Sequence, residues 1–154
     1  MFDPNKFNEE LFGIYGDIVS SMLSFLPDKD MVEKAYFIGE IAEGGLSGNS
    51  LYQIDGKALT SHDAFISMGF ADTDYDNKIF DILRFLNKEL KKIKALFEDT
   101  GQEYPKCIRL TYDVQKGSLE TELSYEPLTT EEFGMHDALM AWRDELNAAL
   151  ESQS

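Results

Sequence analysis

The chain has 154 residues, the usual size of a single domain, so residues 1–154 are taken as one domain. Hydrophobic residues make up 43% of it and aromatic residues 12%, enough to build a core, which excludes an intrinsically disordered chain. Its 14 basic and 29 acidic side chains give a net charge of −15, which disfavours direct binding to nucleic acid or to anionic membranes.

The sequence also indicates a compartment. Cys107 is the only cysteine, so the chain can form no internal disulfide, and this fits a reducing environment. Residues 1–5 lack the basic and apolar regions of a secretory signal. No apolar run approaches the ~20 residues that span a bilayer. We therefore expect a cytoplasmic protein.

The negative charge is distributed unevenly along the chain. Residues 1–77 hold four basic and 14 acidic side chains, residues 78–100 hold six and four, and residues 101–154 hold four and 11. The middle segment is therefore slightly basic and the two outer segments are acidic. An acidic binding face, if the chain has one, is expected to come from the outer segments.

The first predicted element is an amphipathic helix over residues 5–26, which ends before Pro27. Its apolar positions recur at steps of three and four residues, as they do in a helix with one buried face. These positions are Phe7, Leu11, Ile14, Tyr15, Ile18, Met22 and Phe25. Gly13 and Gly16 weaken an isolated helix by roughly 1 kcal/mol each, so we expect them to pack closely against a neighbouring element.

Three strands are predicted next. Residues 34–43 are rich in β-forming types and end at Gly44-Gly45, where a turn is expected. Residues 51–54 form a second strand. Asp55-Gly56 is a two-residue hairpin signal that leads into a third strand over residues 57–60.

The second half of the chain contains the clearest patterns. Residues 61–77 fit neither period, but from Asn77 onward a helix of about 20 residues is predicted, closed by Gly101. Residues 108–114 and 119–125 alternate apolar and polar side chains and predict a hairpin with one buried face. A last helix is expected to begin at Thr129, whose pairing with Glu132 has the form of a capping box.

This order of elements predicts the fold class. The chain reads as an α+β domain in the order α-β-β-β-α-β-β-α, with helices packed on one face of a mostly antiparallel sheet. No internal repeat and no low-complexity linker marks a second domain.

Two groups of residues suggest chemistry, but neither pattern is complete. Asp72, Asp74 and Asp76 alternate like the start of a calcium loop, yet the glycine and the glutamate that the loop requires are replaced by Asn77 and Leu83. We interpret them as a solvated acidic loop and expect no metal or cofactor.

A nucleophilic Cys107 would require a histidine beside it, and the chain offers only His62 and His136. Nothing in the local sequence brings either histidine to the cysteine. Cys107 falls within a predicted strand and is expected to be a small buried residue. No catalytic residue is predicted.

What remains is a surface that could bind a partner. Two acidic patches are predicted, and their members are Asp113, Glu120, Glu122 and Glu126 on the hairpin, and Asp72, Asp74 and Asp76 on the loop. Charged patches of this kind accelerate association with a basic partner and help to select it. The simpler alternative is that they form a solvated side of the sheet.

Several local strings extend this interpretation to a family. They are Ile14-Tyr15 and Phe25-Leu26-Pro27, Val32-Glu33-Lys34-Ala35-Tyr36, Phe97-Glu98-Asp99-Thr100-Gly101-Gln102-Glu103, and the hairpin Asp113-Val114-Gln115-Lys116-Gly117-Ser118-Leu119 followed by Ser124-Tyr125-Glu126-Pro127-Leu128. Over roughly residues 11–146 the chain resembles the YezG-like immunity proteins, which are small bacterial antitoxins that neutralise secreted nuclease toxins.

The resemblance implies a function. It implies a cytoplasmic immunity protein, not an enzyme, that binds a cognate toxin and covers the basic substrate groove of a nuclease with an acidic surface. It implies no catalytic residues and no cofactor. The alternatives are a small enzyme or ligand-binding domain with an acidic pocket, and an interaction module unrelated to toxins.

Overall fold

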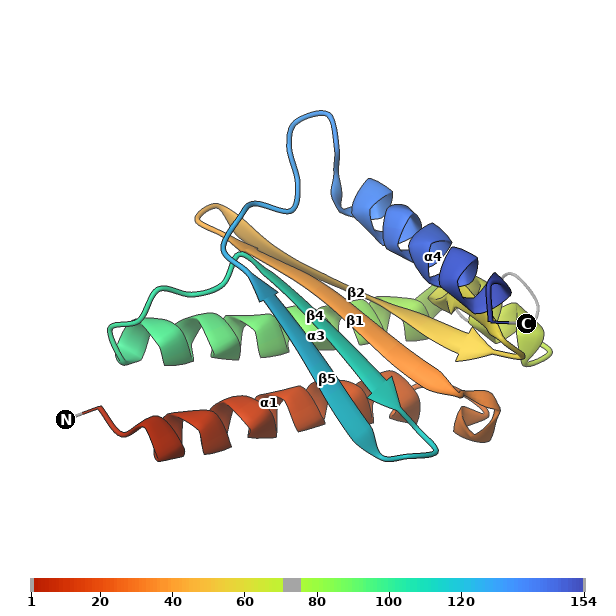
Figure 1. Ribbon diagram of the computed structural model, residues 1–154, viewed down its shortest axis with the longest axis horizontal. Helices are drawn as coiled ribbons and strands as arrows, with labels where there is room; N and C mark the ends of the chain where they lie inside the picture. Colours follow the sequence, from red (N-terminus) through yellow and green to blue (C-terminus); the bar gives the residue numbers. More distant parts are fainter. Residues whose placement is uncertain (1, 71–75, 154) are drawn as a thin grey trace.

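The computed structural model describes residues 2–70 and 76–153, which form an α+β domain around a five-stranded antiparallel sheet. The strands lie in the order β3-β2-β1-β4-β5 (Figure 1). The elements are α1 (Pro4–Ser24), a 3-10 turn (Lys29–Met31), β1 (Lys34–Ala42), β2 (Gly45–Ile54), β3 (Lys57–Thr60), α2 (Ser61–Ser67), α3 (Asp76–Asp99), β4 (Cys107–Asp113), β5 (Ser118–Ser124) and α4 (Met135–Glu151). This confirms the predicted class and order, with the short α2 added before α3.

The two longest helices begin and end where the local sequence requires it. The Asp3 carboxylate caps α1, because its Oδ1 accepts the backbone N–H of Asn5 at 3.0 Å. At the end of α3, Gly101 has a φ of 73°, and the N–H of Gln102 reaches back to the Phe97 carbonyl at 2.9 Å. The predicted carboxyl-terminal cap is therefore confirmed.

Helices α1 and α3 form an antiparallel pair on one face of the sheet. Phe7 and Phe97 meet edge to face at 5.0 Å at one end of the pair, and Phe25 and Phe85 lie 6.4 Å apart at the other. The apolar stripes of both helices are buried against β1, β2 and β4 in the larger of two cores. This layer follows the predicted amphipathic patterns.

Two glycines allow α3 to approach the sheet closely. Gly39 of β1 and Gly48 of β2 are register partners, and both face α3. A Cβ on Gly39 would lie 2.8 Å from Leu90 Cδ2, and a Cβ on Gly48 would lie 3.2 Å from Leu90 Cδ1. Carbon atoms normally pack at about 3.5–4.0 Å, so a side chain at Gly39 has no room.

The opposite face carries α4, so the expectation that the helices cover only one face was wrong. Figure 1 shows α4 on one side of the sheet and the α1–α3 pair on the other. Trp142 of α4 packs edge to face on Tyr36 of β1, with ring centroids 5.5 Å apart, in a second, smaller core. The physical reason lies in β1, whose consecutive residues Tyr36, Phe37 and Ile38 are all buried. A continuous buried run requires cover on both faces.

The start of the last helix was also placed wrongly. Helix α4 begins at Met135, and the N–H of Gly134 is accepted by the Asp137 carboxylate at 2.9 Å. Thr129 does not cap a helix, because its backbone N–H and its hydroxyl both bond to Glu40 of β1, at 2.8 and 2.7 Å.

Three further differences concern local structure. Strand β2 begins at Gly45 and not at residue 51, because it pairs with β1 from Gly45 to Gln53. Helix α2 occupies a stretch where no element was predicted; Thr60 caps it through the N–H of Asp63 at 3.2 Å. Gly13 and Gly16 do not pack closely, since a Cβ on either would have no described heavy atom within 4 Å. None of the described helices has the length and apolar composition needed to cross a bilayer.

Candidate binding surface

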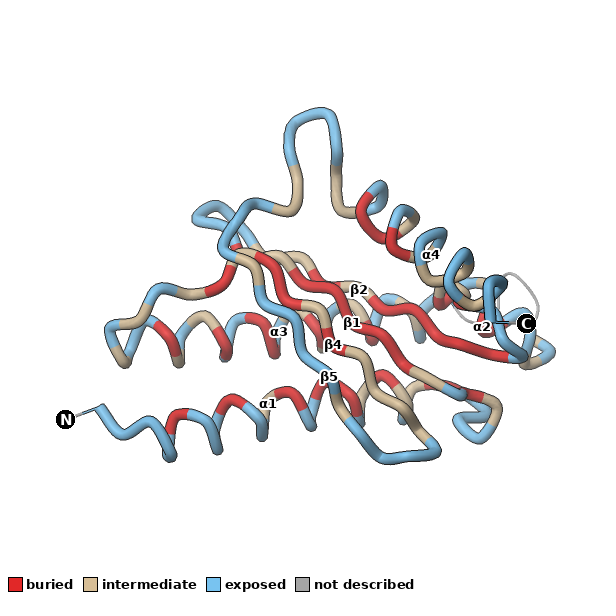
Figure 2. Tube along the Cα trace, in the orientation of Figure 1, coloured by how far each residue is buried: buried red, intermediate tan, exposed pale blue. Residues whose placement is uncertain are grey.

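The two halves of the α4 side of the sheet are covered unequally. Helix α4 packs on β3 and β2 and reaches β1 through Trp142, whereas β4 and β5 extend beyond it. Most of β5 is exposed, as its pale blue colour in Figure 2 shows. We call the α4 side of β4 and β5 the open face. Its residues are the buried Cys107 and the more exposed Arg109, Thr111, Asp113, Ser118, Glu120, Glu122 and Ser124.

The strand register places these residues on one side. Ile38 of β1 belongs to the α4-side core, and its cross-strand partner in β4 is Arg109. Arg109 in turn pairs with Glu122 of β5, and Thr111 pairs with Glu120. Because side chains on a strand alternate between faces, every second residue of β4 and β5 joins them.

The structure brings together three of the predicted binding residues. Asp113, Glu120 and Glu122 all lie on the open face, and Glu126 follows β5 in the connection to α4. Asp113 has an additional role, because its Oδ1 accepts the N–H of Lys116 at 3.0 Å and so shapes the hairpin turn.

The second predicted patch does not join the open face. Asp76 is the first residue of α3, which packs on the other side of the sheet. Asp72 and Asp74 lie outside the described residues. Of the three aspartates in the calcium-loop pattern, only Asp76 therefore lies within the described structure. In the two described ranges no group of three acidic, histidine or cysteine side chains could hold a metal ion.

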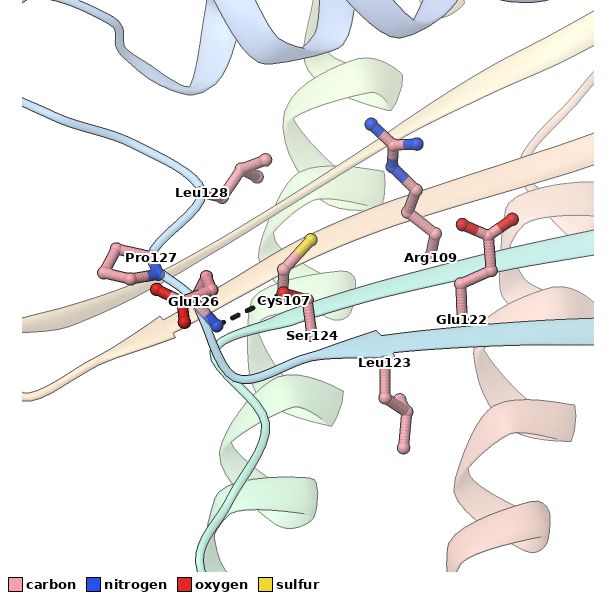
Figure 3. Close-up of a pocket in the computed structure, with 8 residues that line it drawn as sticks. All are labelled: Cys107, Arg109, Glu122, Leu123, Ser124, Glu126, Pro127 and Leu128. Carbon is pink, nitrogen blue, oxygen red and sulfur yellow. Dashed lines mark hydrogen bonds between the residues drawn. The ribbon is translucent and has the colours of Figure 1, made fainter.

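Arg109 provides the only described basic side chain on the open face, and its charge is already engaged. Its guanidinium lies 4.8 Å from the ring centroid of Trp142, a cation–π contact that holds it toward α4. Within the described structure no ion pair joins it to Glu122, although the two side chains stand next to each other in Figure 3. The carboxylates of Glu120 and Glu122 thus remain available, and the face is negative.

The negative charge also acts on a buried group beneath this face. Burial raises the pKa of Tyr36 to about 12, and the nearby carboxylates of Glu33 and Asp113 add to the rise because they disfavour a tyrosinate. The Tyr36 hydroxyl donates to Gln53 Oε1 at 2.9 Å.

A pocket of about 270 Å³ opens beside these carboxylates (Figure 3). It is lined by Cys107, Arg109, Glu122, Leu123, Ser124, Glu126, Pro127 and Leu128. The Cys107 sulfur, Leu128 and Pro127 give it apolar walls, and Glu122 and Glu126 bring carboxylates to it. In the figure Leu123 points to the other side of the sheet.

Glu40 positions one wall of this pocket. Both of its carboxylate oxygens bind Thr129, which follows the lining residues Pro127 and Leu128. Nearer the strand, the N–H of Glu126 donates to Ser124 Oγ at 3.2 Å. Sequence reasoning missed this wall because residues 125–134 form no periodic element, and a bond between residues 89 apart leaves no local signal.

The lining of the pocket does not support a nucleophilic role for Cys107. Burial raises the pKa of the Cys107 thiol, so the cysteine stays protonated; Glu40 and Glu122 raise it further, against the opposing effect of Arg109. Neither His62 nor His136, both within the described ranges, lines the pocket. The expectation of a small buried cysteine is confirmed.

Comparison with known proteins and protein families identifies the family of this chain. No curated protein shows a match to the chain. The sequence profile of the family described as "Immunity protein YezG-like" matches residues 11–152, which is nearly the whole domain. The chain therefore belongs to the YezG-like family of immunity proteins.

Proposed function

We propose that this chain is a cytoplasmic antitoxin that neutralises a cognate secreted toxin by binding it, and not by catalysing a reaction. The observation that carries the proposal is the grouping of Asp113, Glu120 and Glu122 on the part of the sheet that α4 leaves open, in a chain of net charge −15. A surface of one sign attracts a partner of the opposite sign and helps to select it.

A nuclease domain is the toxin that this charge fits best. The substrate groove of a nuclease is basic because it holds phosphates, so an acidic face can lie over the groove and exclude the nucleic acid. The same charge keeps the chain itself away from nucleic acid and from anionic membranes.

Tight inhibition also needs an anchor, since surface charge contributes more to the association rate than to affinity. Strong complexes concentrate their binding energy in a few desolvated side chains. The pocket beside Leu128 combines apolar walls with the carboxylates of Glu122 and Glu126. It suits a lysine or arginine of the toxin, whose aliphatic stem and terminal cation match these two environments.

The test uses the toxin domain encoded by the reading frame next to the gene of this chain. Its nuclease activity is measured on plasmid DNA and on RNA, with and without an equimolar amount of the chain, and binding is measured by calorimetry at low and high salt. We expect inhibition together with an affinity that falls as salt rises.

Two charge-reversal variants separate the two predicted patches. Replacing Glu120, Glu122 and Glu126 with lysine should weaken binding at least about tenfold, because each change places a cation against a basic partner. The matched control replaces Asp72, Asp74 and Asp76 with lysine and changes the net charge equally. If the control weakens binding more, the toxin binds elsewhere on the chain. If the native chain fails to bind the toxin even at low salt, charge mimicry is wrong.

A further inference from the structure

The two edges of the sheet differ in how their backbone groups are satisfied. At the β3 edge the side-chain amide of Asn147, from α4, pairs with Ala58 as a neighbouring strand would: its Oδ1 accepts the Ala58 N–H at 2.7 Å and its Nδ2 donates to the Ala58 carbonyl at 3.1 Å. Further along the same side, the N–H of Gly48 in β2 donates to Asn87 of α3 at 2.8 Å. Helix side chains thus close this edge.

The other edge is β5, and its outward backbone groups have no such cover. In the neighbouring strand β4, even-numbered residues bond toward β1, as the residues at its two ends show: the Lys106 carbonyl accepts the Ile41 N–H at 3.0 Å, and the Val114 N–H donates to the Glu33 carbonyl at 3.1 Å. The Lys106 N–H, one residue before β4, is the exception and donates to the Ser124 carbonyl at 2.8 Å. Hydrogen bonds alternate sides along an antiparallel strand. Odd-numbered residues of β4 therefore bond to the even-numbered residues of β5.

This alternation leaves the N–H and carbonyl groups of Leu119, Thr121 and Leu123 directed outward. In the described part of the chain, no strand lies beside β5 and no side chain bonds to these three residues. Thr121 and Leu123 are exposed, and Leu123 has 42% of its surface accessible. An edge of this kind is a template for one more strand.

The charges on β5 decide which strand fits. Leu119, Thr121 and Leu123, whose backbone groups point outward, have uncharged side chains that share one face of the sheet. Glu120 and Glu122 project from the opposite face, which is the open face. A second copy of the chain paired antiparallel about Thr121 would place Glu120 of one copy opposite Glu122 of the other. Like charges directly opposite each other are destabilising. Two copies would each bring a net charge of −15 as well.

We propose that the outer edge of β5 accepts a strand of the toxin in which lysine or arginine alternates with apolar residues. The basic side chains would face Glu120 and Glu122, and the apolar ones would cover Leu119 and Leu123. The identity of the partner rests on the proposed function, whereas the geometry of the edge does not. The added strand would extend the sheet next to the open face, so both would belong to one interface.

The first experiment tests the edge without the toxin. The probe is the blocked peptide Thr-Lys-Val-Arg-Val-Lys-Thr. One control peptide has the same composition but groups its three cations together. The other control is the alternating peptide N-methylated at the residues whose N–H groups would donate to β5. Amide hydrogen exchange is followed by NMR on the full chain. Without peptide, the amides of Leu119, Thr121 and Leu123 should exchange fast and those of Glu120 and Glu122 slowly.

The alternating peptide should slow exchange at Leu119, Thr121 and Leu123 by at least about tenfold, and the two control peptides should not. Equal protection by the grouped or the methylated peptide would overturn the inference, because it would show charge attraction without strand pairing. Unchanged exchange at these three residues would overturn it as well.

The second experiment uses the toxin and the variants Thr121→Pro and Thr121→Val. Proline removes the outward N–H without breaking a bond to β4, whereas valine keeps that N–H and serves as the matched control. Thr121→Pro should weaken inhibition of the toxin at least about tenfold relative to Thr121→Val. If Thr121→Pro inhibits as well as the native chain, the toxin does not use this edge, although the proposed function stands.

Two further outcomes keep the inferences separate. If the native chain does not inhibit the toxin, the proposed function fails, and the peptide experiment still decides whether the edge accepts a basic strand. A dimer in sedimentation that Thr121→Pro dissolves would assign the edge to a second copy and overturn the inference. Should Thr121→Pro fail to fold, the variant Glu120→Lys/Glu122→Lys replaces it, and it should lose protection by the basic alternating peptide.

Discussion

Replacing glycine with alanine should have opposite effects on stability at two places in this chain. Gly13 and Gly16 lie within α1 on its exposed side, where a Cβ would have no described heavy atom within 4 Å. Alanine there restricts the unfolded chain and should stabilise the protein by about 0.5–1 kcal/mol per site. Gly39 lies within β1 under α3, where space and not backbone freedom decides the result.

The magnitude at Gly39 follows from its neighbours. A Cβ would lie 2.8 Å from both Leu90 Cδ2 and Phe37 Cζ, and both side chains are fully buried at 0% exposure. They cannot move into solvent, so the helix or the strand has to shift. Overpacking of this kind typically costs about 1–3 kcal/mol. Gly39→Ala should therefore lower the free energy of unfolding by that amount.

Urea denaturation followed by far-UV circular dichroism measures both effects as changes in the midpoint at constant slope. In a domain of this size, 1 kcal/mol corresponds to roughly 2–4 °C in Tm. Leu90→Ala makes room for the new methyl group, so the double variant with Gly39→Ala should lose less stability than the sum of the two single variants. A Gly39→Ala protein as stable as Gly13→Ala would refute the close approach of α3 to the sheet.

Other predictions follow from single groups. Tyr15→Phe should leave stability unchanged or raise it by about 1 kcal/mol, because the buried Tyr15 hydroxyl has no partner among the described residues. Tyr52→Phe should cost about 1–2 kcal/mol, since the Tyr52 hydroxyl donates to the Met22 carbonyl. Thermal melts compare the two variants. Burial raises the pKa of Tyr15, Tyr36 and Tyr52 to about 12, so stability is full below pH ~10 and falls as the pH rises toward 12, by on the order of 1–2 kcal/mol per tyrosine. Urea titrations at pH 9 and ~11.5 would contradict this if the midpoints agreed. Asn147→Ala should expose the β3 edge and cost about 1–2 kcal/mol, and faster amide exchange at residue 58 would show it.

Much of the fold could be predicted because its elements carry their own patterns. The stripe of α3, its closing Gly101 and the alternation of the β4–β5 hairpin are local, and the structure confirms each of them. The acidic members of the open face were predicted for the same reason, since Glu120 and Glu122 alternate with apolar residues along one strand.

What could not be predicted depends on contacts between distant residues. The string at Thr129 and Glu132 fits a capping box, yet Glu40 binds Thr129 from another element, and α4 begins six residues later. The Arg109 contact with Trp142 requires knowing which face α4 covers. One signal was present in the sequence, because the unbroken apolar run at residues 35–38 of β1 is typical of a strand covered on both faces.

Two hydrogen-bonded contacts between distant residues on the α4 side also bear on the order of folding. One contact joins Glu40 to Thr129 and the other joins Ala58 to Asn147. Each connects residues 89 apart, so each closes a long loop of the chain. Contacts of high sequence separation form slowly because the chain loses entropy before it gains the contact. Trp142 is the single tryptophan and lies in α4, so its fluorescence reports when this helix docks. We expect that signal to lag behind the far-UV signal in refolding; equal rates would contradict the order. The pocket wall beside the open face would then be completed last, and a newly made chain would present the complete pocket only after α4 has docked.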